Sequence, residues 1–143
     1  MSAPPLILTL KLDQIAFDRL NALRQRYFPP ERNFLPAHIT LFHALPGDRL
    51  DSIEQHLQAV CDETRSLHLQ FLRLRSLGKG VAAEIECPPL ISLHQHLATD
   101  WQAWLSPQDR QKFKPHVTIQ NKVTPEEARQ TYDDLAAVWH PFG

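Results

Sequence analysis

Two short motifs, 78 residues apart, combine residue types that can exchange protons with those that can bind a phosphate. The first is His38-Ile39-Thr40 and the second is His116-Val117-Thr118. An imidazole titrates near neutral pH, so one histidine can remove a proton while a charged partner donates one. Threonine hydroxyls can donate hydrogen bonds to phosphate oxygens as negative charge builds there. This combination predicts acid–base chemistry on a phosphodiester that needs no metal ion.

Each motif lies in a short segment where polar and apolar residues alternate, which is typical of a β-strand. Because side chains two residues apart on a strand point to the same face, His38 and Thr40 share one face. His116 and Thr118 share a face in the same way. The apolar neighbours are predicted to pack against helices on the opposite face: Ile39, Leu41, Val117 and Ile119.

The motifs are part of a longer internal repeat. The same 78-residue shift aligns a second group of apolar residues, Leu57, Ala59 and Val60 with Leu135, Ala137 and Val138. The order of strands and helices also repeats, which predicts two copies of one unit at about 5–77 and 80–143. The last strand of the second copy would fall at about 145–154. We therefore expect this terminal strand to be missing and one sheet edge to be unpaired.

Periodicity and turn signals divide the chain into alternating elements. Gly78-Lys79-Gly80 indicates the turn of a hairpin, and Thr124 followed by Pro125 and Glu127 indicates a helix start. Strands are predicted at 6–12, 37–41, 67–76, 80–86 and 117–123, and helices at 13–27, 48–63, 88–105 and from 124 onward.

Composition limits the classes of function that remain. The 143 residues are 43% apolar and carry 15 Lys+Arg against 16 Asp+Glu, which fits one globular domain. A net charge of −1 excludes a broad basic surface for nucleic acid, so any phosphate site must be local. Two cysteines make no disulfide framework, and no apolar run reaches membrane-span length. We expect a cytoplasmic monomer that makes no membrane contact.

The two motifs stand in the segments Pro36-Ala37-His38-Ile39-Thr40-Leu41 and Lys114-Pro115-His116-Val117-Thr118-Ile119. With them the chain resembles the 2H phosphoesterase superfamily, and most closely its bacterial 2′-5′ RNA ligase-like branch. The resemblance implies an α+β fold of two pseudo-symmetric lobes, with two antiparallel sheets flanked by helices and a central cleft. It also implies metal-independent opening of 2′,3′-cyclic phosphates, on RNA or nucleotides, to 2′-phosphates. In the family the first histidine is the proton donor and the second the acceptor, a polarity that the symmetric motifs leave open.

Six residues are candidates for binding the substrate. Lys122 shares strand parity with His116, and Phe42 shares it with His38, where it could stack on a base. Arg75 and Lys114 are candidate phosphate contacts, as are Arg73 and Lys112. The alternative for the basic residues is an ordinary solvated surface, and for Phe42 a place in the core. No histidine pair has ligand spacing along the chain, including His94 with His96, and neither a metal nor a cofactor is expected.

Two other functions are compatible with the motifs. One is a reversible 2′-5′ RNA ligase, or a phosphodiesterase for small nucleotide-derived cyclic compounds. The other is a catalytically silent module that binds nucleotides or RNA. Because binding alone does not need a paired acid and base, the presence of both His-x-Thr motifs favours an enzyme.

Overall fold

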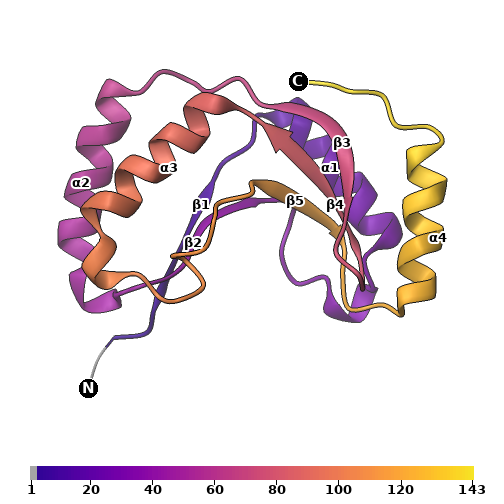
Figure 1. The fold of residues 1–143 in the computed structure, drawn as a ribbon, viewed down its shortest axis with the longest axis horizontal. Coiled ribbons are helices and arrows are strands. Elements are labelled where there is room, and N and C mark those ends of the chain that lie inside the picture. Colours follow the sequence, from indigo (N-terminus) through magenta and orange to yellow (C-terminus); the bar gives the residue numbers. More distant parts are fainter. Residues whose placement is uncertain (1–2) are drawn as a thin grey trace. The chain divides into compact units, whose positions relative to one another are not determined.

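The computed structural model describes residues 3–143 (Figure 1). In this part of the chain, four α-helices are interspersed with five strands, and the strands form two β-sheets. This confirms the predicted α+β class. The strands are β1 (Leu6–Leu10), β2 (Ile39–Leu45), β3 (Gln70–Ser76), β4 (Val81–Glu86) and β5 (His116–Gln120). The helices are α1 (Gln14–Tyr27), α2 (Leu50–Glu63), α3 (Pro88–Asp100) and α4 (Pro125–Ala136).

The chain folds into two compact units, each built from segments that lie far apart in the sequence. Unit 1 comprises the described part of Met1–Thr9 together with Thr40–His68 and Cys87–Phe113. Unit 2 comprises Leu10–Ile39, Leu69–Glu86 and Lys114–Gly143. Each unit therefore takes segments from both sequence repeats.

Unit 1 contains the two-stranded sheet of β1 and β2 with α2 and α3. Its core includes His94, whose ring stacks between Phe42 (4.4 Å between centroids) and Phe113 (3.8 Å). His94 Nε2 donates to the carbonyl oxygen of Leu41 at 2.9 Å. Burial lowers the pKa of His94, against the smaller opposing effects of this hydrogen bond and of the Asp109 charge. His94 is therefore a neutral core residue.

Unit 2 is built around an antiparallel sheet in the order β3-β4-β5. Helix α1 packs against β5, and α4 packs against β3 (Figure 1). The predicted hairpin joins β3 to β4, with Gly78 at φ 83° in the turn. A Cβ on Gly80 would lie only 1.9 Å from the carbonyl oxygen of Gln120, so the approach of this turn to the end of β5 requires glycine.

Helix α4 begins as its sequence predicts. Thr124 is the N-cap residue, and its Oγ1 accepts a hydrogen bond from the backbone N–H of Glu127 at 3.2 Å. Pro125 occupies the first turn, where its missing N–H costs no helical hydrogen bond. The acidic residues of this turn, Glu126 and Glu127, lie at the positive end of the helix dipole.

Several element ends differ from the prediction, and three of the differences are the largest near the motifs and in α3. Strand β2 extends to Leu45, because the Phe42 side chain is also buried and apolar residues continue beyond the motif. Strand β5 ends at Gln120 instead of continuing to residue 123. Helix α3 ends at Asp100, and Gln102–Trp104 forms a separate 3₁₀ turn.

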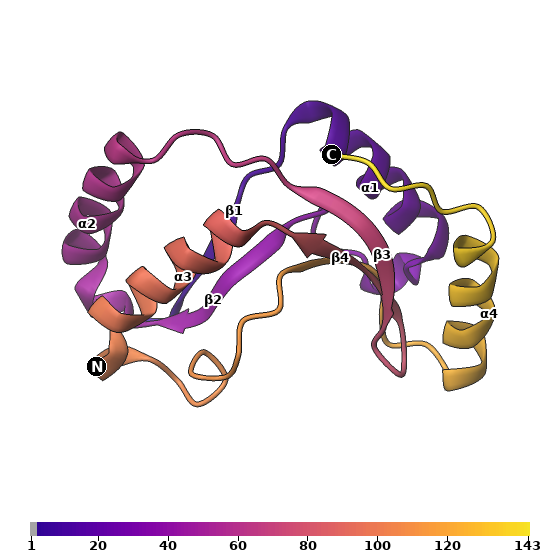
Figure 2. The same cartoon turned by 45° about the horizontal axis from the view of Figure 1, so that its top comes forward.

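The segment after α4 returns to the outer edge of β3 (Figure 2). The N–H of Phe71 donates to the carbonyl of Phe142 at 2.7 Å, and the two rings stack with centroids 4.8 Å apart. The guanidinium of Arg19, on α1, lies 4.1 Å from the centroid of the Phe142 ring. This single antiparallel bridge covers part of the outer edge of β3. The other sheet consists of two strands, β1 and β2, within the described residues. Within residues 3–143, no helix combines the length and apolarity that a bilayer crossing requires.

Candidate active site

The two His-x-Thr motifs have the same pattern of burial. His38 and Thr40 are partly exposed while the intervening Ile39 is fully buried. His116 and Thr118 are likewise partly exposed, and Val117 between them is fully buried. The predicted strand parity is therefore confirmed in both motifs, and each histidine shares its exposed face with a threonine.

Both motif histidines make the same hydrogen bond to their own backbone. His38 Nδ1 lies 2.8 Å from the carbonyl oxygen of Pro36, and His116 Nδ1 lies 2.8 Å from that of Lys114. Because a carbonyl can only accept, Nδ1 carries the proton and donates in each case. In the neutral ring, Nε2 is then the nitrogen that takes up a proton. The bond fixes the tautomer and the ring orientation that acid–base catalysis requires.

The sheet of unit 2 places three charged side chains on the His116 face. Glu84 is paired directly with His116 across β4 and β5, and Arg73 is paired with Glu84 across β3 and β4. Arg75, two residues from Arg73, lies on the same face and is paired with Ala82, which in turn is paired with Thr118. The fully buried Ala82 has no side chain beyond Cβ to separate Arg75 from the motif.

Arg75, a candidate phosphate contact in the sequence, contacts the second motif directly. Its Nη1 donates to the carbonyl of Lys114 at 3.3 Å and lies 3.3 Å from His116 Nδ1. Its Nη2 donates to Glu84 Oε1 at 3.1 Å, which fixes the guanidinium. Glu84 was not predicted, although it has polar parity in its strand, because its pairing with Arg75 depends on the register of the hairpin.

One face of α1 holds the backbone of both motifs. Asn21 Oδ1 accepts a hydrogen bond from the N–H of Ala37, the residue before His38, at 3.0 Å. Arg24 Nη1 donates to the carbonyl of Thr118 at 2.9 Å. Asn21 and Arg24 are three residues apart and so point to the same side of the helix. Helix α1 is therefore the common support of the two motifs in unit 2.

Arg24 is only 4% exposed, which is unusual because a charged side chain is rarely buried. Burial lowers its pKa, and its guanidinium lies 4.3 Å from the centroid of the Phe28 ring. Besides Thr118, Arg24 holds Asn33 Oδ1 through Nη2 at 2.9 Å. Among the described residues, its Nε has no hydrogen-bond partner. The cost of burying this group is offset by two bonds that only a forked cation can make at once.

Replacing Arg24 by methionine is expected to lower the free energy of unfolding by about 1–3 kcal/mol, because the acceptors on Thr118 and Asn33 lose their partner. Arg24→Lys should recover only part of this loss, since one ammonium cannot reproduce the fork. The measurement is urea denaturation, together with the amide chemical shifts of Thr118 and Asn33. The exposed Arg26 offers a matched control, Arg26→Met. Equal stability of the Arg24→Met and Arg26→Met proteins would contradict this role.

Lys122 does not share a strand face with His116, so that prediction was wrong. Strand β5 ends at Gln120, two residues earlier. Lys122 has a φ of 63°, in the left-handed region, and its N–H donates to Asn121 Oδ1 at 2.9 Å. Strand parity cannot orient a side chain in such a turn. The Lys114 side chain is exposed, and its part in phosphate binding stays a prediction.

Phe42 is not available to stack on a base, contrary to the prediction. Its side chain is fully buried in unit 1. One face of its ring stacks on His94, and Trp101 contacts it edge-on with centroids 5.4 Å apart. The parity argument placed Phe42 with His38, but β2 is apolar at two successive positions here, Leu41 and Phe42.

Comparison with known proteins agrees with the geometry of the motifs. Residues 12–143 match the model of the 2′-5′ RNA ligase superfamily. A comparison with curated proteins finds no match. The matched region contains both His-x-Thr motifs and confirms the resemblance to 2H phosphoesterases: the chain belongs to the 2′-5′ RNA ligase superfamily.

Proposed function

We propose that the protein is a metal-independent phosphodiesterase that opens 2′,3′-cyclic phosphates on RNA ends or nucleotides and leaves a 2′-phosphate. Membership of the 2′-5′ RNA ligase superfamily supports chemistry on phosphate esters. The observation that carries the proposal is the identical Nδ1 hydrogen bond of His38 and His116. A residue kept only for packing would not need the same tautomer in two separate strands.

In the proposed reaction, Nε2 of one histidine accepts a proton from water as the water oxygen bonds to phosphorus. The bond between phosphorus and the 3′ oxygen breaks, and Nε2 of the other histidine donates its proton to that oxygen. The hydroxyls of Thr40 and Thr118 donate to the non-bridging phosphate oxygens, where charge increases in the transition state. The two rings end in exchanged protonation states and return to the start through solvent.

We assign the acceptor role to His116 and the donor role to His38. Arg75 Nη1 lies 3.3 Å from the His116 ring. Glu84 pairs with Arg75 and holds its guanidinium there, where it would donate to a phosphate oxygen beside the ring. The assignment of the two roles follows the polarity implied by the family resemblance.

The direct test is turnover of a 2′,3′-cyclic mononucleotide and of an oligonucleotide with a cyclic phosphate end, each with excess EDTA. We expect turnover that chelation does not reduce, and a 2′-phosphate as the product. Comparison of the two substrates also measures the preference for RNA over nucleotides. Loss of turnover in EDTA with recovery on adding metal, or a 3′-phosphate product, would contradict the proposal. Binding without turnover would favour the silent module.

A second candidate activity is 2′-5′ ligation, which the name of the superfamily favours. The 5′-hydroxyl oxygen of a second RNA would lose its proton to one histidine and bond to phosphorus in place of water. The bond between phosphorus and the 3′ oxygen would break, the other histidine would protonate that oxygen, and a 2′-5′ linkage would form. The test adds an RNA with a free 5′-hydroxyl to the assay above. A product that resists a 3′-5′-specific nuclease would identify the linkage.

A further inference from the structure

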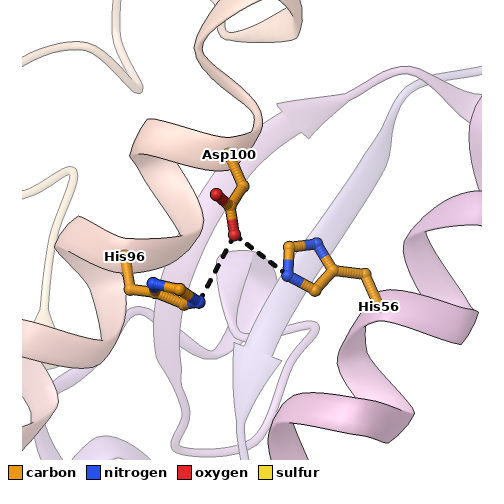
Figure 3. Close-up of side chains that lie close together, drawn as sticks. All are labelled: His56, His96 and Asp100. Atoms are coloured by element: carbon orange, nitrogen blue, oxygen red, sulfur yellow. Dashed lines mark ion pairs between the residues drawn. The ribbon is translucent and has the colours of Figure 1, made fainter.

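Three side chains outside the His-x-Thr motifs converge in unit 1 (Figure 3). His56 comes from α2, and His96 and Asp100 come from neighbouring turns of α3. Asp100 Oδ2 lies 3.1 Å from His56 Nε2 and 3.3 Å from His96 Nε2. The three ligand atoms all lie within 4.8 Å of one another. The sequence did not reveal this group, because one of its members lies on a different helix.

The distances fit a small transition-metal ion. Ligands about 2.0–2.1 Å from a tetrahedral zinc are separated by about 3.3–3.4 Å. Both His–Asp distances are close to this value, and only the His–His separation needs adjustment. The His96 side chain can provide it, since it is 61% exposed. The exposure of Asp100, 39%, leaves an approach for a water molecule as the fourth ligand.

We propose that His56, His96 and Asp100 bind a divalent ion of the zinc class. Two imidazoles and one carboxylate are ligands that zinc prefers, whereas magnesium and calcium favour oxygen. With both imidazoles neutral, the three ligands carry a net charge of −1. A bound divalent ion would change the net charge of the site to +1. The ion would link α2 to α3 and stabilise the folded state.

Trp101 opposes this binding by fixing the wrong tautomer of His56. Its indole Nε1 donates to His56 Nδ1 at 3.0 Å, so the proton of a neutral His56 lies on Nε2 and faces Asp100. A metal on Nε2 moves that proton to Nδ1, where it meets the indole N–H. Because Trp101 is 2% exposed, its N–H cannot readily turn to water instead. Zinc affinity is therefore expected to be moderate, and the indole reports on occupancy.

The first experiment titrates the chelator-treated, full-length protein with zinc chloride by calorimetry. We expect one site per chain, with binding at least 100-fold weaker in His96→Ala and Asp100→Asn. The matched control is His68→Ala, which removes an exposed histidine outside the cluster and should bind as the unaltered chain does. Equal affinity in His96→Ala and His68→Ala, or no binding below millimolar zinc, would overturn the proposal.

A second measurement tests the role of Trp101, first in the unaltered chain and then in a Trp101 variant. Imidazole ¹⁵N spectra should show His56 with its proton on Nε2 without zinc and on Nδ1 with zinc, while the indole N–H resonance of Trp101 shifts. In Trp101→Phe, which has no N–H to oppose the metal, zinc should bind about 10-fold more tightly. An indole resonance that does not move at saturating zinc would contradict binding through His56. The outcome is independent of the cyclic phosphate assay, which is carried out in EDTA.

Discussion

Alanine at His38 or at His116 is expected to lower kcat for opening a 2′,3′-cyclic phosphate by about 10²–10⁴-fold, the usual contribution of one general acid or base. Both rings are partly exposed, so neither change should unfold the chain. The double variant should lose little more than either single one, because the two histidines act in one step. The measurement is initial rate at saturating substrate, with urea denaturation as a check on folding.

The matched control is His43→Ala. His43 is an exposed histidine of β2, only five residues from His38, and its backbone N–H rather than its ring makes the contact with Asp109. Turnover of this variant should equal that of the unaltered chain. If His43→Ala lost as much activity as His38→Ala, the loss would report damage to β2 and not the removal of a proton donor.

The polarity can be tested with a cyclic substrate that has sulfur in place of the 3′ bridging oxygen. A thiolate leaves without needing a proton, so this substrate should restore most of the rate of His38→Ala. His116→Ala should not be rescued, because activation of water is still missing. Rescue of His116→Ala alone would show that His116 is the proton donor and His38 the acceptor. Rescue of neither would exclude a rate-limiting proton donation by either ring.

The local geometry of the motifs could be predicted because it depends on short-range rules. Strand parity placed Ile39 and Val117 in the core and their histidine neighbours on the exposed face. The cap of α4 at Thr124 also follows from four consecutive residue types. Each of these predictions needs only the preferences of the chain within one turn or one strand.

The position of Lys122 depends on where strand β5 ends, and local sequence patterns define the ends of strands and helices poorly. Val123 continues the apolar alternation of β5, yet the chain leaves the sheet at Asn121 and passes through the left-handed conformation of Lys122. The N–H of Val123 instead bonds to the carbonyl of Lys79 in the hairpin turn, at 3.1 Å. This tertiary contact overrides the pattern and removes Lys122 from the face of His116.

The remaining features require pairing between distant segments. The hairpin turn at Gly78 forces the last strand of the first repeat to pair with the first strand of the second. The pairing of β4 with β5 then brings Arg75, across Ala82, beside the second motif. Helix α1 reaches both motifs through Asn21 and Arg24. The repeat in the sequence does not indicate that strands and helices of one copy pack with those of the other. Neither the support by α1 nor the His56 cluster could therefore be predicted.

Asp109→Ala is expected to cause the largest loss of stability, a fall of about 2–4 kcal/mol in the free energy of unfolding, because two backbone donors lose a charged acceptor. Asp109 is 6% exposed. Its two oxygens accept hydrogen bonds from the N–H groups of His43, at 2.8 Å, and Ala44, at 3.0 Å. These bonds tie the segment before Phe113 to β2.

Urea denaturation measures the change, and hydrogen exchange locates it. The amides of His43 and Ala44 should exchange slowly in the unaltered chain and at least 10-fold faster in Asp109→Ala. Asp109→Asn should lie between the two, because its amide keeps one acceptor oxygen and turns an N–H toward the other donor. The exposed Asp133 provides a control, since its replacement by alanine should change stability by no more than about 0.5 kcal/mol. Faster exchange throughout unit 1, rather than first at these two amides, would show that Asp109 supports the whole unit and not the β2 contact alone.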